Sequence, residues 1–175
     1  MKNLFLIAAT ALLLVSGCKK GEELTKFDIS YSSEFTVPAT STVSTPYDFY
    51  TPEITSDYKE KFEKYKTASD KVESIKLKSL NVNISDPSGS SLKFMKSIEV
   101  YIEADGKGEE RIAWKMDIPE TVGESMNIEL SGTDLKPFIV SDKFKMRARA
   151  INDEAITVDH IINIEGTFEV DAKIL

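Results

Sequence analysis

The sequence predicts an all-β, mainly antiparallel fold: an immunoglobulin-like β-sandwich with one amphipathic helix and a short helical turn. Apolar and polar residues alternate in several separate stretches, as in strands that have one buried and one solvated face. Turn-rich sequences typical of hairpins join the stretches, among them SDPSGS (85–90) and ADGKGEE (104–110). No pair of cysteines brackets Trp114, so the disulfide typical of antibody domains is absent from the sequence.

Four strands are predicted from alternation alone, over residues 27–37, 98–104, 112–118 and a shorter piece at 126–130. In each, one parity is apolar and is expected to face the core, whereas the other is mostly polar. The residues expected to face inward are Phe27, Ile29, Tyr31, Phe35 and Val37; Ile98, Val100, Ile102 and Ala104; Ile112, Trp114, Met116 and Ile118; and Met126, Ile128 and Leu130.

A fifth predicted strand changes phase along its length. The apolar residues of 75–77 share one parity, whereas those of 80–84 share the other. A β-bulge adds one residue to a strand and so shifts its side chains by one position. A bulge near Lys78–Ser79 therefore restores a common inward face.

The last two predicted strands, 143–149 and 156–172, differ in charge. The first carries only Lys and Arg on its polar parity, and the second carries mainly acidic residues there. Opposite charges across a strand pair contribute about 0.2–1 kcal/mol each and favour one register, so we expect a hairpin. Its register gives the pairs Arg149–Asp159 and Lys143–Glu165. The alternative is that the basic strip binds an anion or lipopolysaccharide.

Two segments are not predicted as strands. Residues 55–71 place three aromatic residues at helical spacing and are expected to form an amphipathic helix across a sheet opening. Its aromatic residues are Tyr58, Phe62 and Tyr65, and its candidate N-terminal caps are Thr55 and Ser56. Residues 133–140 read as a short helical turn, with Asp134 near its start and Pro137 early enough to be tolerated.

The chain begins with a segment typical of secretory signals. Lys2 precedes an apolar run from Leu4 to Val15 that is interrupted by Thr10. A run of about a dozen residues spans about 18 Å as a helix, too short for a hydrocarbon core of about 30 Å. A basic start, a short apolar core and small residues at the exit indicate a cleaved signal rather than a membrane span.

The exit, Val15-Ser16-Gly17-Cys18, contains the one cysteine of the chain and resembles the lipobox of bacterial lipoproteins. The resemblance implies that signal peptidase II cuts between Gly17 and Cys18, and that Cys18 carries the lipid. Two or more acyl chains hold a protein on a membrane, whereas one binds only reversibly. Lys19, in place of the aspartate that retains some lipoproteins at the inner membrane, favours the outer membrane of a Gram-negative bacterium.

The resemblance divides the chain into a signal peptide (1–17), a lipidated tether (18–25) and a single β-sandwich domain (26–175). The alternative is an ordinary signal peptide with a chance cysteine, or a free structural thiol. Beyond the motif, the strand-rich body loosely resembles small, uncharacterised β-sandwich lipoproteins of Gram-negative bacteria. That likeness brings no functional residues with it.

Charge and composition argue against several kinds of partner. The formal net charge is −7, and removal of Lys2 with the signal makes the mature chain one unit more negative. An acidic chain is a poor partner for nucleic acid and does not adhere to an anionic membrane by charge. Once Cys18 carries lipid, no thiol remains for a disulfide, a nucleophile or a zinc site. We expect no cofactor and no metal.

The sequence offers little catalytic chemistry. His160, the one histidine, falls on the apolar parity of the last strand, which indicates a core-edge or hydrogen-bonded residue. DGKGE (105–109) resembles a calcium loop superficially, but Lys107 occupies a ligand position, so we expect a hairpin tip. We therefore expect a non-enzyme. An uncatalogued hydrolase is the alternative, and it requires a cleft with paired carboxylates or His160.

One stretch suggests a ligand-binding surface. TPYDFYTP (45–52) holds Tyr47, Phe49 and Tyr50 between two prolines. Aromatic rings stack on sugars or anchor protein partners, and in connectors they also close the core. We expect a lipid-anchored binding or structural domain of the cell envelope whose partner is an envelope protein. The alternative is a carbohydrate-binding module that uses these three rings as a loop platform.

Overall fold

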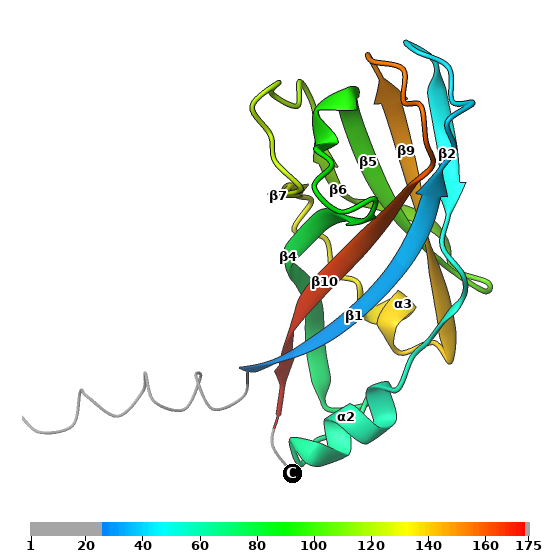
Figure 1. Cartoon of the computed structure of the whole chain (residues 1–175). Coiled ribbons are helices and arrows are strands. Elements are labelled where there is room, and N and C mark those ends of the chain that lie inside the picture. Colours follow the sequence, from blue (N-terminus) through cyan, green and yellow to red (C-terminus); the bar gives the residue numbers. More distant parts are fainter. Residues whose placement is uncertain (1–25, 174–175) are drawn as a thin grey trace, which may run out of the picture.

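The structure, a computed structural model, describes residues 26–173 and consists of two packed antiparallel sheets (Figure 1). Sheet A has the order β1 (Lys26–Val37), β10 (His160–Ala172), β4 (Val72–Asp86) and β7 (Ser125–Asn127). Sheet B has the order β2 (Pro46–Tyr50), β9 (Lys143–Asn152), β5 (Met95–Ala104), β6 (Gly108–Lys115) and β8 (Glu129–Leu130), and β3 (Ile54–Thr55) also pairs with β9. The predicted all-β, antiparallel class is confirmed.

The immunoglobulin-like connectivity is not confirmed. The chain crosses between the sheets after β1, β3, β4, β6, β7 and β9, and within residues 26–173 the one hairpin between strands of eight or more residues is β5–β6. Neighbouring strands in the sequence are therefore mostly partners across the core rather than within a sheet. Alternation identifies a half-buried strand without identifying its sheet, which is why the sequence did not reveal this order.

The bulge predicted in the fifth strand is confirmed in β4. The register of β4 with β10 steps from Ser79–Thr167 to Leu77–Phe168, so Lys78 has no counterpart. As a result, the apolar residues on both sides of the bulge are buried.

A second bulge, which alternation did not predict, lies in β6. Ile112 and Ala113 are adjacent and both fully buried, because the register with β5 shifts by one residue at this point. The strand ends at Lys115. The predicted inward positions of Trp114 and Met116 are therefore wrong: Trp114 is half-buried opposite Glu99, and Met116 is 47% exposed.

The predicted hairpin between the last two strands is also wrong. β9 lies in sheet B between β2 and β5, whereas β10 lies in sheet A between β1 and β4. Arg149 therefore faces Asp48 and Glu99, and Asp159 accepts a hydrogen bond from the Ala39 amide instead. The pair Lys143–Glu165 is likewise absent from the register, and Lys143 pairs with Glu53. Charge complementarity could not identify the partner of β9, because β5 also presents acidic residues to it, Glu99 and Glu103.

The predicted amphipathic helix is present but short. Helix α2 covers Tyr58–Lys64, with Tyr58 and Phe62 buried. The N-cap is Asp57 rather than Thr55 or Ser56. The predicted helical turn is confirmed as α3 (Lys136–Ile139), and the Asp134 carboxylate accepts the amides of Ile75 and Lys136 at 2.9 and 3.1 Å.

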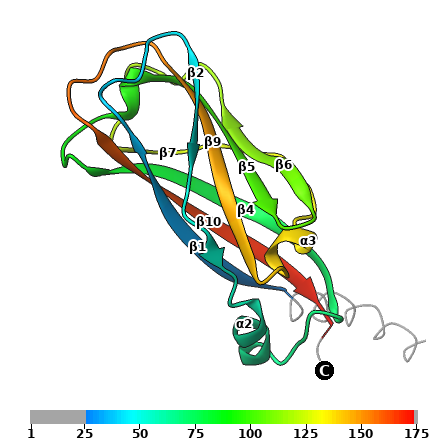
Figure 2. The same ribbon diagram turned by 90° about the vertical axis from the view of Figure 1, so that its right-hand side faces the viewer.

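The two ends of the sandwich differ in construction. Helix α2 lies at the end where β1 begins and β10 finishes, whereas the opposite end consists of loops and the short 3₁₀ helix η1 (Leu92–Phe94) (Figures 1 and 2). We call these the helix end and the loop end. Within residues 26–173, no helix has the length and apolar character needed to cross a membrane.

The strand order makes a prediction about stability. Because Arg149 lies on β9 in sheet B, whereas Asp159 lies in the loop that leads into β10 of sheet A, R149A and D159A should destabilise additively, within about 0.3–0.5 kcal/mol. Lys145 and Glu103 are cross-strand neighbours 3.4 Å apart, so K145A and E103A should couple by about 0.2–1 kcal/mol. Urea unfolding of the two double-mutant cycles measures both values. Coupling in the first cycle but not the second would contradict the strand order.

Candidate functional site

The three aromatic residues predicted as a platform lie on strand β2, not on a loop. Tyr47 is half-buried, and Phe49 is 8% exposed and stacks on Phe35 at 5.3 Å. Tyr50 has the opposite parity and is 58% exposed. Successive side chains of a strand point to opposite faces, so the three rings do not form one surface. Tyr50 alone among them offers an open ring.

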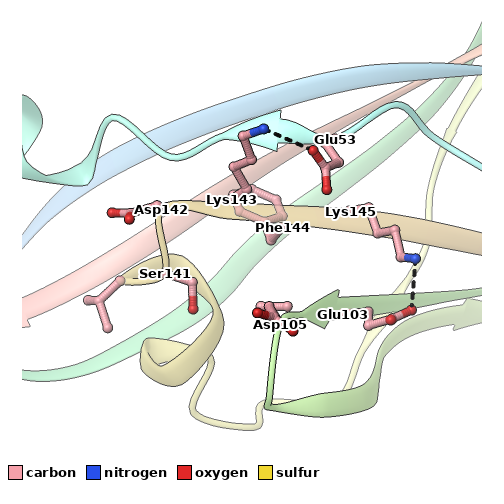
Figure 3. A pocket seen from close by; sticks show the side chains of 10 residues that line it. Glu53, Glu103, Asp105, Ser141, Asp142, Lys143, Phe144 and Lys145 are labelled. Carbon is pink, nitrogen blue, oxygen red and sulfur yellow. Dashed lines mark hydrogen bonds and ion pairs between the residues drawn. The ribbon is translucent and has the colours of Figure 1, made fainter.

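A hollow of about 700 Å³ lies at the helix end of sheet B (Figure 3). It is formed where β9 begins, between the connection from β2 to β3 and the tip of the β5–β6 hairpin. Glu53, Glu103, Ala104, Asp105, Val140, Ser141, Asp142, Lys143, Phe144 and Lys145 line it. Charged side chains therefore dominate the wall, while Phe144 itself is buried in the core.

Two ion pairs flank β9 at the hollow (Figure 3). Lys143 extends toward Glu53 at 3.0 Å, and Lys145 extends the other way toward Glu103 at 3.4 Å. Both lysines share one parity of β9 and so leave the strand on its outer face. Asp142 lies 3.7 Å from a lysine of α2, and Asp105 forms no ion pair within residues 26–173. The hollow thus offers acceptors and donors with a residual negative charge.

Tyr50 lies beside the hollow. The Lys145 ammonium, which lines the hollow, is 5.9 Å from the centre of the Tyr50 ring. An open ring next to paired carboxylates and ammonium groups combines a stacking surface with hydrogen-bonding groups. This is the composition of sites that bind polar ligands with an apolar face.

The rest of the outer face of sheet B is occupied by a charged network centred on Arg147. Its guanidinium donates two hydrogen bonds of 2.7 Å to Glu109 and another to Asp48, and it lies 4.0 Å from the Tyr101 ring. The side chain is only 11% exposed. The hydrogen bonds to Arg147 lower the pKa of Glu109, and the same contacts raise the pKa of Arg147. Bidentate pairs of this kind are among the strongest hydrogen bonds in proteins.

A second arginine repeats the arrangement. Arg111 bonds to Glu99 at 2.6 Å, and its guanidinium lies 4.5 Å from the Trp114 ring. The faces of Tyr101 and Trp114 are therefore contacted by guanidinium groups of the protein itself. Sequence reasoning missed these networks because they depend on which strands pair: Arg147 of β9 reaches β2 and β6, and Arg111 of β6 reaches β5.

His160 is buried, as the sequence predicted. It is 7% exposed, contacts Phe94 with ring centres 4.9 Å apart, and its Nδ1 lies 2.9 Å from the Val158 carbonyl. Since a carbonyl only accepts, Nδ1 carries the proton and donates. His160 is at the loop end and does not line the hollow. The predicted hairpin tip at 105–109 is likewise confirmed by the β5–β6 register.

A buried network of hydroxyl groups lies next to the start of α2. Ser56 donates to the Ile139 carbonyl, and Tyr31 lies 3.3 Å from the Ser56 hydroxyl. Burial raises the pKa of Tyr31. Lys61 sits 3.7 Å from the Tyr31 ring centre and bonds to Asp57 at 2.9 Å. Because the Ser56 proton is held by a carbonyl, this arrangement anchors the helix end rather than activating a nucleophile.

Several predicted features lie outside the described residues: the signal peptide (1–17), the tether (18–25) and the lipidation residue Cys18. Within residues 26–173, no group of three His, Cys, Asp or Glu side chains is placed to hold a metal ion.

Comparisons with known proteins do not identify a family. No protein-family model and no curated protein matches the chain. A chain from the structure titled Desmodium yellow mottle tymovirus is 16% identical, with 86% of this chain and 90% of that chain covered and a TM-score of 0.31. A chain from the structure of the empty head of Turnip yellow mosaic virus is 12% identical, with 85% and 84% covered and a TM-score of 0.28. Scores this low do not establish a common fold.

The Arg147 network generates a prediction. R147M should lower the free energy of unfolding by about 1.5–3 kcal/mol, because it removes charged hydrogen bonds and leaves two carboxylates unpaired. Arg149 lies on the same face without an ion pair in the described part of the chain, so R149M should change stability by no more than about 0.5 kcal/mol. Urea unfolding at neutral pH compares the two.

The stability that R147M loses should depend on pH. The folded-state pKa of Glu109 is lowered from its ordinary 4.5, so its pairing stabilises the fold fully above about pH 4.5. That contribution disappears as the pH falls through the lowered pKa, where Glu109 becomes protonated. The difference between wild type and R147M should therefore shrink below pH 4.5. A difference that is constant down to pH 2 would show that Arg147 acts by packing alone.

Proposed function

We propose that the protein is a lipid-anchored lipoprotein of the bacterial cell envelope, held by a lipid on Cys18, with a non-catalytic domain that binds or scaffolds a partner. The observation that carries the proposal is the order of the N-terminal features: a short apolar run, the lipobox Val15-Ser16-Gly17-Cys18, and a first strand that begins at Lys26. The outer membrane of a Gram-negative bacterium is the proposed location. The single-domain body is proposed to span 26–175.

Two features of the described residues support a non-catalytic role. The hollow is lined by carboxylates that are mostly ion-paired, and His160 lies at the other end of the sandwich. The hydrolase alternative needs a cleft with paired carboxylates or His160, whereas the Glu53, Glu103 and Asp142 carboxylates of this hollow are held in ion pairs with lysines. Binding domains, in contrast, need only a stable surface with a few open groups.

We infer that the sandwich is a jelly roll rather than an immunoglobulin-like domain. The orders β1-β10-β4-β7 and β2-β9-β5-β6, with repeated crossings between sheets, support this connectivity. A fold of this kind hosts many functions, so the inference leaves the ligand open.

The anchor is tested by C18A. In cells, C18A should remain unlipidated and appear in the soluble fraction, while wild type stays with membranes and incorporates radiolabelled palmitate. The matched control is S16A, which keeps a small residue in the lipobox and should behave as wild type. Detergent-sensitive membrane association of C18A equal to that of wild type would contradict the proposal.

A second candidate function is carbohydrate binding at the hollow. It is favoured by the open ring of Tyr50 beside the charged wall. In this candidate site Tyr50 alone takes the place of the predicted three-ring platform, because Phe49 is buried and Tyr47 is half-buried.

Carbohydrate binding is tested on a glycan array followed by titration calorimetry with the best oligosaccharide. Y50A should weaken binding about tenfold or more, the equivalent of about 1.4 kcal/mol. The control is Y65A, which removes another exposed ring, 41% exposed, that does not line the hollow. Equal affinities of wild type and Y50A, or no bound glycan at all, would exclude this candidate.

A further inference from the structure

The loop end is a single, hydrogen-bonded surface. It comprises four segments, 38–45, 86–94, 116–124 and 153–159, which gather at one end of the sandwich (Figures 1 and 2). Backbone hydrogen bonds hold them together: Asp153 bonds to Phe94 and Leu92 to Gly123, both at 3.0 Å, and Ser44 bonds at 2.7 Å to Asn152, where β9 ends. The Ala39 amide also donates to Asp159 at 2.8 Å. Such a surface is ordered before it meets a partner, which lowers the entropic cost of binding.

This surface is strongly acidic. Lys93 is the one basic residue of the four segments, and it is already paired with Glu154 at 3.4 Å. The seven carboxylates of the four segments are all exposed: Asp86, Asp117, Glu120, Glu124, Asp153, Glu154 and Asp159. A concentration of one sign of charge attracts a partner of the opposite sign and speeds its association.

Exposed apolar side chains lie among these carboxylates. Val43 is 41% exposed, Met116 is 47% exposed and Val158 is 51% exposed. Three of the five large apolar side chains that are strongly exposed in residues 26–173 thus lie on these loops. Met116 also lines a hollow of about 300 Å³, together with Ser44, Lys96, Ser97, Asp117 and Ile151. Met116 and Ile151 give this hollow an apolar part, and a hollow that combines apolar and polar groups can hold a partner's side chain as an anchor.

We propose that the loop end is a docking surface for a Lys/Arg-rich segment of a protein partner, with an apolar side chain of that segment in the hollow beside Met116 and Ile151. Charge complementarity selects this occupant: seven carboxylates outnumber the two lysines, Lys93, which is ion-paired, and Lys96, which lines the hollow, and so favour a basic segment over an acidic protein or an anionic membrane. The proposal rests on the proposed binding role of the domain. It assigns that role a partner class and a surface away from the Tyr50 hollow.

The test uses the full-length protein purified in detergent and a synthetic peptide in which Lys and Leu alternate. Calorimetry gives its Kd at about 0.05 M and about 0.3 M salt, which brackets the range where surface charges are progressively screened. The loop-end variant D117N/E120Q/E124Q should weaken binding about tenfold and flatten the salt dependence. A peptide with Glu in place of Lys should not bind.

The matched control is E60Q/E63Q/E165Q, which removes three exposed carboxylates away from the loop end, none with an ion pair in the described part of the chain. It should leave the Kd within about twofold of wild type. Equal weakening by both triple variants would show a diffuse attraction to the acidic chain and would overturn the proposal. So would an affinity for the peptide that D117N/E120Q/E124Q does not change, or no measurable binding.

The second arm identifies the partner in cells. A photo-crosslinking residue at Val158 should capture a protein through a Lys/Arg-rich segment, and the same residue at Thr167, on the outer face of sheet A, should not. Capture of a glycan, a lipid or an acidic segment at Val158 would overturn the proposal. Since C18A tests the anchor and the peptide tests the loop end in detergent, failure of one is distinguishable from failure of the other.

Discussion

Burial of the inner face of each sheet against the other is the constraint on which the structure depends. Residues 26–173 contain no cysteine, so no disulfide within them adds to the stability that this burial provides. Two strands contain β-bulges that keep their apolar residues facing the core. In β4 the bulge at Lys78 returns the residues on both sides to the core, and in β6 a register shift buries Ile112 and Ala113 together. Each bulge gives up local pairing because exposing an aliphatic side chain instead would forgo about 1.5–3 kcal/mol.

The outer faces follow from this arrangement. Because β9 lies between β2 and β5, its basic parity meets acids from both sides, and Arg147 bonds to Asp48 and Glu109 at once. The guanidinium also covers Tyr101. A face whose charges and rings are already partnered has little to offer a ligand without first breaking its own contacts. Open groups are therefore found at the ends of the sandwich, at Tyr50 beside the larger hollow and on the loops.

The sequence predicted the features that depend on local pattern. The strand over 27–37, the bulge near Lys78 and the turn at 133–140 follow from parity, phase and turn chemistry. Features that depend on distant neighbours were missed. Alternation does not tell which sheet a strand joins, so the charges of β9 and β10 suggested a hairpin between strands of different sheets. The same limit applies to TPYDFYTP (45–52), where pairing of β2 with β9 sends Phe49 inward and Tyr50 outward.

Under the proposed anchor, the helix end and the loop end of the sandwich lie at different distances from the membrane. The span from Cys18 to Lys26 covers eight peptide steps, at most about 26–29 Å when fully extended. β1 runs from the helix end toward the loop end over 12 residues, about 40 Å at the usual rise per residue. A lipid on Cys18 would thus keep the hollow beside Lys143 in the half of the domain nearer the membrane, and the acidic loops in the farther half. The negative charge of the loops then lies away from anionic headgroups, where it repels least and meets basic partners first.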